Sequence, residues 1–261
     1  MQCENKRYEN GRFENKHILI TGASSGIGYA TALLMANEGA HIAFTYRHNE
    51  KGAQQLKSEL ALCGHKVLDF RVDMNRDEEV ISLAENVIAE FGQVDILFNN
   101  AGGLVERMPF FEMNREKWDE IMNLNVWSLV LLSQKIGMNM KQNGGGVIVH
   151  NASVAGRFGG GIGACAYAVA KGAVITLTKS MGKELIHDGI RVNAIAPGVI
   201  DTPFHDQFTP PDVMQVLMKN IPIGRTGTAA EMAQVVAFLA SEESSYLVGA
   251  TIDANGGMWV V

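Results

Sequence analysis

The chain has 261 residues, of which 47% are hydrophobic, 19% charged and 7% aromatic, with 28 glycines and 6 prolines. This composition is typical of a globular protein and excludes a disordered, collagen-like or fibrous one. The formal net charge is −6, and the sequence contains no run of Lys or Arg that would form a basic patch. We therefore expect neither nucleic acid nor an anionic membrane as a partner.

The cysteines and the N-terminus indicate the compartment. Cys3, Cys63 and Cys165 are odd in number and far apart, and they form no Cys-x-x-Cys or Cys/His pattern. This excludes a disulfide framework and predicts no metal site. Residues 1–13 are polar and lack the apolar core of a secretory signal, and no stretch of about 18 apolar residues occurs. We expect a cytoplasmic protein with a polar N-terminal extension over residues 1–13.

Short apolar runs bounded by turn residues recur along the chain and predict buried strands. These runs are His17–Thr21, His41–Tyr46, Lys66–Asp73, Asp95–Ala101, Val147–Ala152, Ile190–Ala196 and Ala250–Asp253. The longer segments between them predict helices, namely Ile27–Asn37, Lys51–Leu62, Asp77–Phe91, Arg115–Lys141, Tyr167–His187 and Ala229–Ala240. Thr228 and Glu231 have the spacing of a capping box at the start of the last helix.

Strands that alternate with helices predict parallel strands joined by right-handed crossovers, with helices on both faces of one sheet. The fold class is therefore α/β: a single doubly wound Rossmann domain over residues 14–261 with a seven-stranded, mostly parallel sheet. The segment 197–228 is rich in proline, lacks clear periodicity and follows a strand end, where open α/β sheets bind ligands. We predict that it is a substrate loop or lid.

A glycine-rich turn, Thr21–Gly28 (TGASSGIG), joins the first strand to the first helix. Its glycines let the backbone turn tightly and approach a pyrophosphate, which the helix N-terminus then stabilises. The strand before the turn and the helix after it are the context that a dinucleotide fingerprint requires. A bare tight turn is the alternative explanation.

The end of the second strand bears on the choice of dinucleotide. Its sequence, Thr45-Tyr46-Arg47-His48, has no carboxylate to bind a ribose 2′-hydroxyl, whereas Arg47 can bind a 2′-phosphate bidentately. The sequence therefore favours NADP(H), with NAD(H) possible. The alternative is that Arg47 is an ordinary surface arginine.

Tyr167 and Lys171 are four residues apart and share one face of a predicted helix. A nearby ammonium favours the phenolate, so we expect Lys171 to lower the pKa of Tyr167 from its ordinary value near 10, as a general acid/base requires. Ser153 follows the fifth strand and can donate a hydrogen bond to a substrate carbonyl oxygen. By contrast, we expect His150, inside that strand, to be a packed histidine rather than a catalyst.

Further motifs are Asp73, Asn99-Asn100-Ala101-Gly102, Asn125 and Pro197-Gly198 through Thr202. In order and spacing, all these motifs together resemble the short-chain dehydrogenase/reductase family, from about residue 14 to 257. The resemblance implies catalysis by Asn125, Ser153, Tyr167 and Lys171, with Asn125 supporting a water chain. It implies cofactor binding by Gly22, Ser24, Ser25, Gly26, Ile27, Gly28, Arg47, Asp73, Asn99, Ala101, Gly102, Tyr167, Lys171, Pro197, Gly198, Ile200 and Thr202. It also implies a homotetramer or homodimer that pairs through the helices at 115–141 and 167–187.

Ser153 and Tyr167 are 14 residues apart, one more than in many members of that family, and the extra residue falls in the glycine-rich run 158–163. With 99–105, 201–205 and 221–228, this run resembles the bacterial reductases of 4-deoxy-hexoseulose uronate, an alginate-derived keto acid. Three cations follow strand ends, where they could bind a substrate carboxylate: Arg107, Arg157 and His205. Each can equally be an ordinary surface cation.

We therefore expect an NADP(H)-dependent oxidoreductase that interconverts a carbonyl and an alcohol by hydride transfer, with Tyr167 as acid/base and such a uronate as small-molecule substrate. One alternative within catalysis is a 3-oxoacyl-(acyl-carrier-protein) reductase, and another is an enzyme like glucose 1-dehydrogenase. A third alternative is a dinucleotide-binding regulator that has lost turnover.

Overall fold

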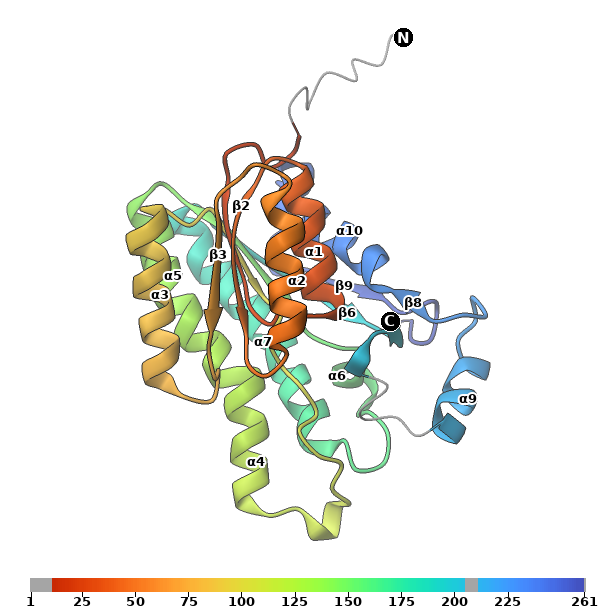
Figure 1. Cartoon of the computed structure of the whole chain (residues 1–261). Helices are drawn as coiled ribbons and strands as arrows, with labels where there is room; N and C mark the ends of the chain where they lie inside the picture. Colours follow the sequence, from red (N-terminus) through yellow and green to blue (C-terminus); the bar gives the residue numbers. More distant parts are fainter. Residues whose placement is uncertain (1–10, 205–210, 261) are drawn as a thin grey trace.

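A single sheet of seven parallel strands forms the centre of the computed structural model, which describes residues 11–204 and 211–260 (Figure 1). The strand order is β3-β2-β1-β4-β5-β6-β9. The strands are β1 (His17–Ile20), β2 (His41–Tyr46), β3 (Val67–Arg71), β4 (Ile96–Asn99), β5 (Gly146–Asn151), β6 (Ile190–Pro197) and β9 (Thr251–Ala254). This order reverses between β1 and β4, as in a doubly wound fold, so the predicted fold class is confirmed.

Helices cover both faces of the sheet (Figure 1). One layer contains α1 (Gly26–Asn37), α2 (Glu50–Ala61) and α10 (Ala229–Ala240). The other contains α3 (Asp77–Phe91), α5 (Ser128–Gln142) and α7 (Cys165–Leu185). The predicted capping box is present at the start of α10, where Thr228 and Glu231 bond each other's backbone N–H.

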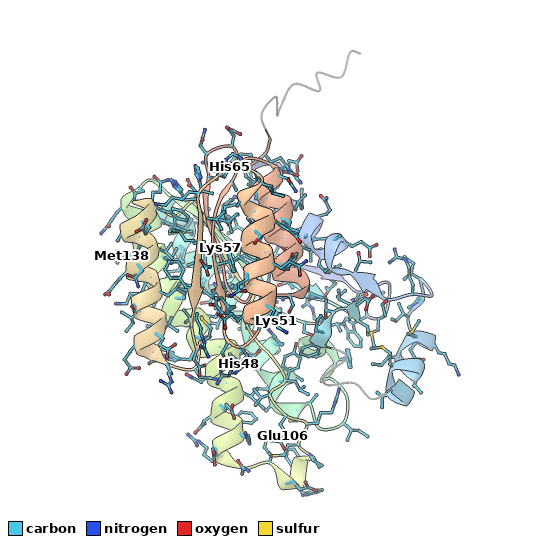
Figure 2. All side chains as sticks on the ribbon, in the orientation of Figure 1. His48, Lys51, Lys57, His65, Glu106 and Met138 are labelled. Carbon is cyan, nitrogen blue, oxygen red and sulfur yellow. The ribbon has the colours of Figure 1, made fainter. Side chains whose placement is uncertain are left out.

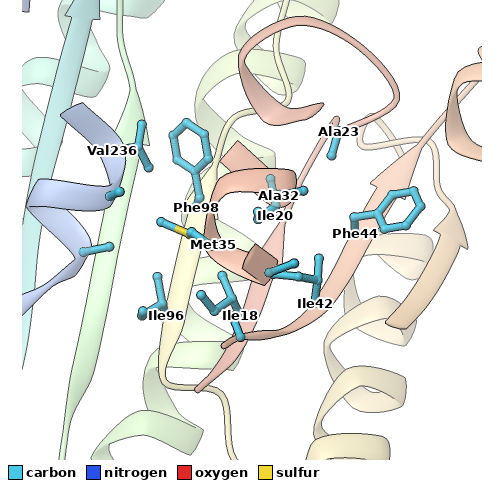
Figure 3. Packing of buried hydrophobic residues seen from close by; sticks show 14 of the residues in the cluster. Ile18, Ile20, Ala23, Ala32, Met35, Ile42, Phe44, Ile96, Phe98 and Val236 are labelled. Carbon is cyan, nitrogen blue, oxygen red and sulfur yellow. The ribbon is translucent and has the colours of Figure 1, made fainter. Parts of the chain in front are cut away.

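The side chains of the central strands alternate between two cores, because successive residues of a strand point to opposite faces. Ile18 and Ile20 of β1 pack with Met35 of α1, and Figure 3 shows this cluster. Leu19 faces the opposite core, with Leu132 of α5. Burial on both faces explains why the strands read as continuous apolar runs.

The N-terminal boundary of the packed region lies inside the segment that we assigned to a polar extension. Phe13 is 1% exposed and belongs to the core, and Arg12 forms an ion pair with Glu38. These contacts fasten residues 12 and 13 to the end of α1.

The predicted helix Arg115–Lys141 is interrupted in the structure. It consists of α4 (Arg115–Met122), a π-helical turn η2 (Asn123–Trp127) and α5. A π-helical turn contains an extra residue, which changes the direction of the side chains that follow, and such turns are frequent at functional sites. This one contains the buried Asn125.

The segment 197–228 has more regular structure than the sequence indicated. Its ends, β7 (Ile200–Asp201) and β8 (Gly227–Thr228), form a two-stranded parallel sheet, and α9 (Pro211–Lys219) lies between them. The remaining elements are α6 (Ala155–Phe158) and the short 3₁₀ helices η1 (Phe110–Glu112), η3 (Ile186–Asp188) and η4 (Glu242–Ser244). The short sheet holds the two ends of the predicted lid together at the edge of the main sheet.

Two further features concern the described residues. None of their helices is long and apolar enough to cross a membrane. Among the same residues, no cluster of three His, Cys, Asp or Glu side chains could hold a metal ion.

His150 of β5 is fully buried, as a packed histidine should be. Its Nδ1 lies 3.0 Å from the Oγ1 of Thr178, which donates its only proton to the carbonyl oxygen of Val174. Thr178 must therefore accept from His150, which places the imidazole proton on Nδ1. Burial, with a smaller contribution from the charge of Lys171, lowers the pKa of His150 from 6.5 to about 3.

We predict that His150 makes the fold sensitive to acid. Between pH 6.5 and about 3 the unfolded chain protonates this imidazole and the folded chain does not, so the free energy of unfolding falls as the pH falls. The His150 contribution is at most about 1.4 kcal/mol per pH unit. Urea unfolding at about pH 7 and about pH 5 should show a smaller loss in His150→Asn than in wild type. The exposed His187 provides the control, and His187→Asn should keep the wild-type loss.

Candidate active site

A cleft of about 820 Å³ lies at the carboxyl ends of the parallel strands. Open α/β sheets bind ligands at this edge, because the loops after neighbouring strands converge there. The cleft brings together most of the residues that the sequence predicted, namely Gly22, Ser24, Ser25, Gly26, Ile27, Arg47, Ala101, Gly102, Arg107, Ser153, Tyr167, Lys171, Pro197, Gly198, Ile200 and Thr202.

Five other predicted residues are not part of the described lining. They are Gly28, Asp73, Asn99, Asn125 and Arg157. His205 is outside the residues that the structure describes, so its predicted role remains a prediction.

The glycine-rich loop after β1 makes room for a ligand backbone. Gly22 has a φ of +66°, which favours glycine. At Gly28 a Cβ atom would lie 2.6 Å from both the Nδ2 of Asn100 and the carbonyl oxygen of Gly22. The loop leads into the N-terminus of α1, where backbone N–H groups attract anions, and Ser24 to Ile27 face the cleft. These residues fit the pyrophosphate of a dinucleotide.

Asn100 fixes the shape of this loop, and it was missing from our predicted site. Its Nδ2 donates to the carbonyl oxygens of Thr21 and Gly22, at 2.9 and 2.8 Å. Its Oδ1 accepts from Asn151 at 3.0 Å. The neighbouring Asn99 points to the opposite face of the sheet, donates to Ser133 of α5 and is not part of the described cleft lining, so its binding of the cofactor remains a prediction. Strand alternation around the pair was the signal that could have separated them.

Arg47 lies at the adenosine end of the cleft, together with Thr45, Tyr46 and His48. Its Nη2 is 2.8 Å from the Oδ2 of Asp73. The resemblance implied that Asp73 binds the cofactor; in this structure its carboxylate is paired with Arg47, and a contact with the cofactor remains a prediction. Thr45 is a second residue that the sequence did not reveal, because its Oγ1 accepts from the N–H of Gly22 at 3.0 Å.

Tyr167, Lys171 and Ser153 meet in the middle of the cleft. Tyr167 and Lys171 lie one turn apart on α7, with the Lys171 Nζ 5.7 Å from the centroid of the Tyr167 ring. That Nζ donates to the carbonyl oxygen of Asn151 at 2.7 Å. Ser153 hydrogen-bonds the phenol and accepts from the N–H of Ala155 at 3.1 Å. The predicted constellation is therefore assembled around one point.

Burial controls the protonation of this corner. It raises the pKa of Tyr167 to about 12, and the hydrogen bond from Ser153 opposes this only in part. Burial also lowers the pKa of Lys171 to about 8. The pKa of Tyr167 therefore does not fall below its ordinary value as we expected, because removing the phenol from water outweighs the effects that favour the phenolate. The phenol is protonated at neutral pH and suits the role of proton donor.

The side chain of Asn125 hydrogen-bonds backbone groups in the wall of the cleft. From the π-helical turn, its Nδ2 donates to the carbonyl oxygens of Gly103 and Ile121, both at 2.9 Å. Its Oδ1 accepts from the N–H of Gly103 at 3.1 Å. The side chain thus positions the loop after β4, next to Lys171.

The predicted substrate arginines have different surroundings. Arg107 lines the cleft, and its Nη1 donates to the carbonyl oxygen of Ile162 in the glycine-rich run, at 2.8 Å. Arg157 instead forms a two-point ion pair with Asp253 of β9, at 3.0 and 3.1 Å, and does not line the cleft. The prediction that Arg157 contacts the substrate is therefore wrong, because its guanidinium connects α6 to the sheet.

The substrate end of the cleft is otherwise largely apolar. Its described lining includes Leu104, Phe158, Ile162, Phe204, Val213, Leu217 and Met258. The Phe204 ring lies 6.0 Å from that of Tyr167, centroid to centroid. A carbonyl compound bound here would be shielded from water on several sides.

Comparisons with known proteins agree with this geometry. The family model described as enoyl-(acyl carrier protein) reductase matches residues 22–259. The 3-oxoacyl-(acyl-carrier-protein) reductase of Thermotoga maritima is 38% identical over 247 residues, which are 95% of this chain and 99% of the relative. The enzyme of the same name from Escherichia coli is also 38% identical, over 95% of this chain and 99% of its own length.

Solved structures give the same result. A 7α-hydroxysteroid dehydrogenase in complex with NADH and 7-oxo glycochenodeoxycholic acid has a TM-score of 0.89 and 34% identity, covering 95% of this chain and 96% of that one. The NADH-dependent reductase A1-R′, responsible for alginate metabolism, has a TM-score of 0.87 and 31% identity, covering 95% and 99%. This chain belongs to the short-chain dehydrogenase/reductase family.

The family assignment makes this chain an NAD(P)-dependent oxidoreductase. The alternative of a regulator without turnover has no support, because Ser153, Tyr167 and Lys171 are present and converge in the cleft. The matched relatives named here include an enzyme of alginate metabolism, but the curated ones are 3-oxoacyl-(acyl-carrier-protein) reductases. The resemblance to uronate reductases in particular is therefore not established by them.

We predict that Tyr167→Phe removes turnover without removing cofactor binding. The phenol donates the proton, and general acid–base catalysis contributes about 10²–10⁴-fold, so kcat should fall by at least about 100-fold. NADPH titration by fluorescence should give a Kd close to that of wild type. The fully exposed Tyr246 supplies the control, since Tyr246→Phe should leave kcat unchanged. Wild-type turnover in Tyr167→Phe would contradict the assignment of Tyr167.

We further predict that carbonyl reduction declines above about pH 8. There Lys171 loses its proton, and with it the positive charge beside the phenol that must become a phenolate. The value of kcat/KM should be flat below this pH and fall above it, whereas Tyr167 itself titrates only near 12. In Lys171→Arg the charge persists, so the decline should move to higher pH. A wild-type reduction rate that rises steadily toward pH 10 would rule out this role of Lys171.

Proposed function

We propose that this enzyme uses NADPH to reduce the carbonyl group of a small anionic sugar acid, with 4-deoxy-hexoseulose uronate as the first candidate. The observation that carries the proposal is the position of Arg107 at the substrate end of the cleft, held against the glycine-rich run. Arginine is the side chain best suited to bind a carboxylate.

The chemistry divides between cofactor and protein. A bound nicotinamide supplies the hydride that is added to the carbonyl carbon. The protein would hold the dinucleotide with the glycine-rich loop and Arg47. Ser153 would donate a hydrogen bond to the carbonyl oxygen and orient it. Tyr167 would then give its phenolic proton to that oxygen, completing the alcohol, and Lys171 would stabilise the phenolate that remains.

The run 158–163 supports a hydroxylated substrate. It contains four glycines, of which Gly160 and Gly161 line the cleft. Gly160 and Gly161 have no side chains to cover their peptide groups, although the carbonyl oxygen of Gly161 already accepts from the N–H of Ala164. Together with the guanidinium of Arg107, these peptide groups offer both charge and polar groups to a sugar acid in an otherwise apolar pocket.

A 3-oxoacyl thioester is the second candidate. The curated relatives support it more directly than the uronate, since those named above are 3-oxoacyl-(acyl-carrier-protein) reductases. The apolar side chains of Phe158, Phe204 and Leu217 also suit an acyl chain. Against it, an acidic carrier protein requires a basic docking patch, and the chain has a net charge of −6. An uncharged sugar such as glucose has no carboxylate for Arg107 to bind.

The decisive experiment measures the initial rate of NADPH oxidation with 4-deoxy-hexoseulose uronate and, in parallel, with an acetoacetyl thioester. Faster turnover of the uronate supports the proposal. A preference for the thioester would replace it with the second candidate.

We predict that Arg107→Ala raises the KM for the uronate by about 10- to 100-fold, because a hydrogen bond to a charged group contributes about 1.5–3 kcal/mol. The value of kcat should change less, since Tyr167 and Ser153 remain. Steady-state kinetics with both substrates separate the effects, and the KM for the thioester should stay close to that of wild type. Arg115, exposed on α4, gives the matched control Arg115→Ala. An equal loss for both substrates would show that Arg107 only supports the loop.

A further inference from the structure

A second charged side chain, the carboxylate of Asp73, lies next to Arg47 and does not come from the end of β2. Arg47 follows β2 and Asp73 follows β3, the neighbouring strand. The Nη2 of Arg47 lies 2.8 Å from the Oδ2 of Asp73. Val72 and Met74, on either side of Asp73, line the cleft together with Arg47. We propose that Asp73 sets the preference between NADP(H) and NAD(H) by partly neutralising Arg47. This inference rests on the proposed use of NADPH.

The ion pair is held in place from both sides. The Oδ1 of Asp73 accepts from the N–H of Asn75 at 3.0 Å, and its own N–H donates to Glu79 at 2.7 Å. On the other side, the Nε of Arg71 donates to the carbonyl oxygen of Arg47 at 3.2 Å. The Asp73 side chain is 20% exposed and that of Arg47 44% exposed. The carboxylate is therefore the fixed partner and the guanidinium the more accessible one.

Electrostatics gives the direction of the effect. A 2′-phosphate on NADP(H) would share the guanidinium of Arg47 with Asp73 and would lie near a second negative charge, which weakens its binding. The 2′-hydroxyl of NAD(H) carries no charge and escapes this repulsion. Asp73 thereby reduces the selectivity for NADP(H) that Arg47 alone would give. The pair admits both dinucleotides, and the carboxylate determines the ratio.

The substitution Asp73→Asn removes the charge and keeps the turn that Asp73 forms with Asn75. Asparagine keeps an oxygen for the N–H of Asn75, and this residue type suits such a turn as well as aspartate does. The amide group that replaces Oδ2 presents N–H donors to Arg47, so the substitution removes the negative charge together with its ion pair. Asp73→Glu retains the charge and should restore the wild-type ratio. A matched control lies on β3, the strand that precedes Asp73: Asp69 is paired with Lys57 at 2.7 Å, and neither residue lines the cleft.

Figure 2 labels His48, which lies in the loop before α2, and Lys57, which lies farther along α2. His48 lines the cleft, as Arg47 does. The control pair Lys57–Asp69 thus tests the loss of an ion pair on β3 away from the adenosine corner.

The experiment is equilibrium titration of NADPH and of NADH, followed by nucleotide fluorescence, on wild type and the four variants Asp73→Asn, Asp73→Glu, Arg47→Ala and Asp69→Asn. We expect Asp73→Asn to tighten NADPH about tenfold while the Kd of NADH changes less than about twofold. Arg47→Ala should weaken NADPH selectively. Asp73→Glu and Asp69→Asn should keep the wild-type ratio of the two Kd values.

Three results would overturn the inference. Equal weakening of both cofactors in Asp73→Asn would show a contact with adenine or a structural role. An unchanged ratio would show that the carboxylate has no influence on the 2′ position. A shift toward NADH would show that Asp73 assists the phosphate by orienting Arg47. Failure of the proposed function looks different, because then wild type would bind NADPH no better than NADH and Arg47→Ala would not change NADPH binding.

Discussion

A continuous set of hydrogen bonds across the carboxyl edge of the sheet joins the catalytic corner to the glycine-rich loop. The Nζ of Lys171 bonds the carbonyl oxygen of Asn151, and the side chain of Asn151 bonds Asn100. Asn100 in turn holds the carbonyl oxygens of Thr21 and Gly22. These bonds cross from α7 through β5 and β4 to β1. The position of the proton donor relative to the dinucleotide loop depends on this connection.

These hydrogen bonds also explain how the ammonium group of Lys171 can be buried in the site. Lys171 is 4% exposed, and an ammonium in such a place is costly unless it is hydrogen-bonded. The carbonyl oxygen of Asn151 provides one partner, yet burial still lowers the pKa of Lys171 to about 8. A lysine that is charged at neutral pH but close to its pKa can respond to a change of charge on the neighbouring phenol. The same burial keeps Tyr167 protonated at neutral pH.

The sequence predicted the order of strands and helices and most of the cleft lining, because those features depend on local period and on short motifs. It failed where the outcome depends on contacts between distant residues. The ion pair between Arg157 and Asp253 joins residues that are 96 apart in the sequence. The ion pair between Arg47 and Asp73 forms because β2 and β3 are neighbours in the sheet. The π-helical turn around Asn125 has no distinct hydrophobic period. The raised pKa of Tyr167 reflects burial, which spacing along a helix does not measure.

Chemistry and specificity occupy different parts of this scaffold. Ser153, Tyr167 and Lys171 are fixed by β5 and α7, whereas Arg107 and the run 158–163 belong to loops that contact each other across the mouth of the cleft. In this family, relatives of 31–38% identity have names that refer to a 3-oxoacyl-(acyl-carrier-protein), a hydroxysteroid and alginate. The loops can therefore change substrate without disturbing the hydrogen-bonded edge of the sheet. Arg157 is paired with Asp253 and does not line the cleft, whereas Arg107 does line it, and for this reason the proposed recognition of a carboxylate is assigned to Arg107.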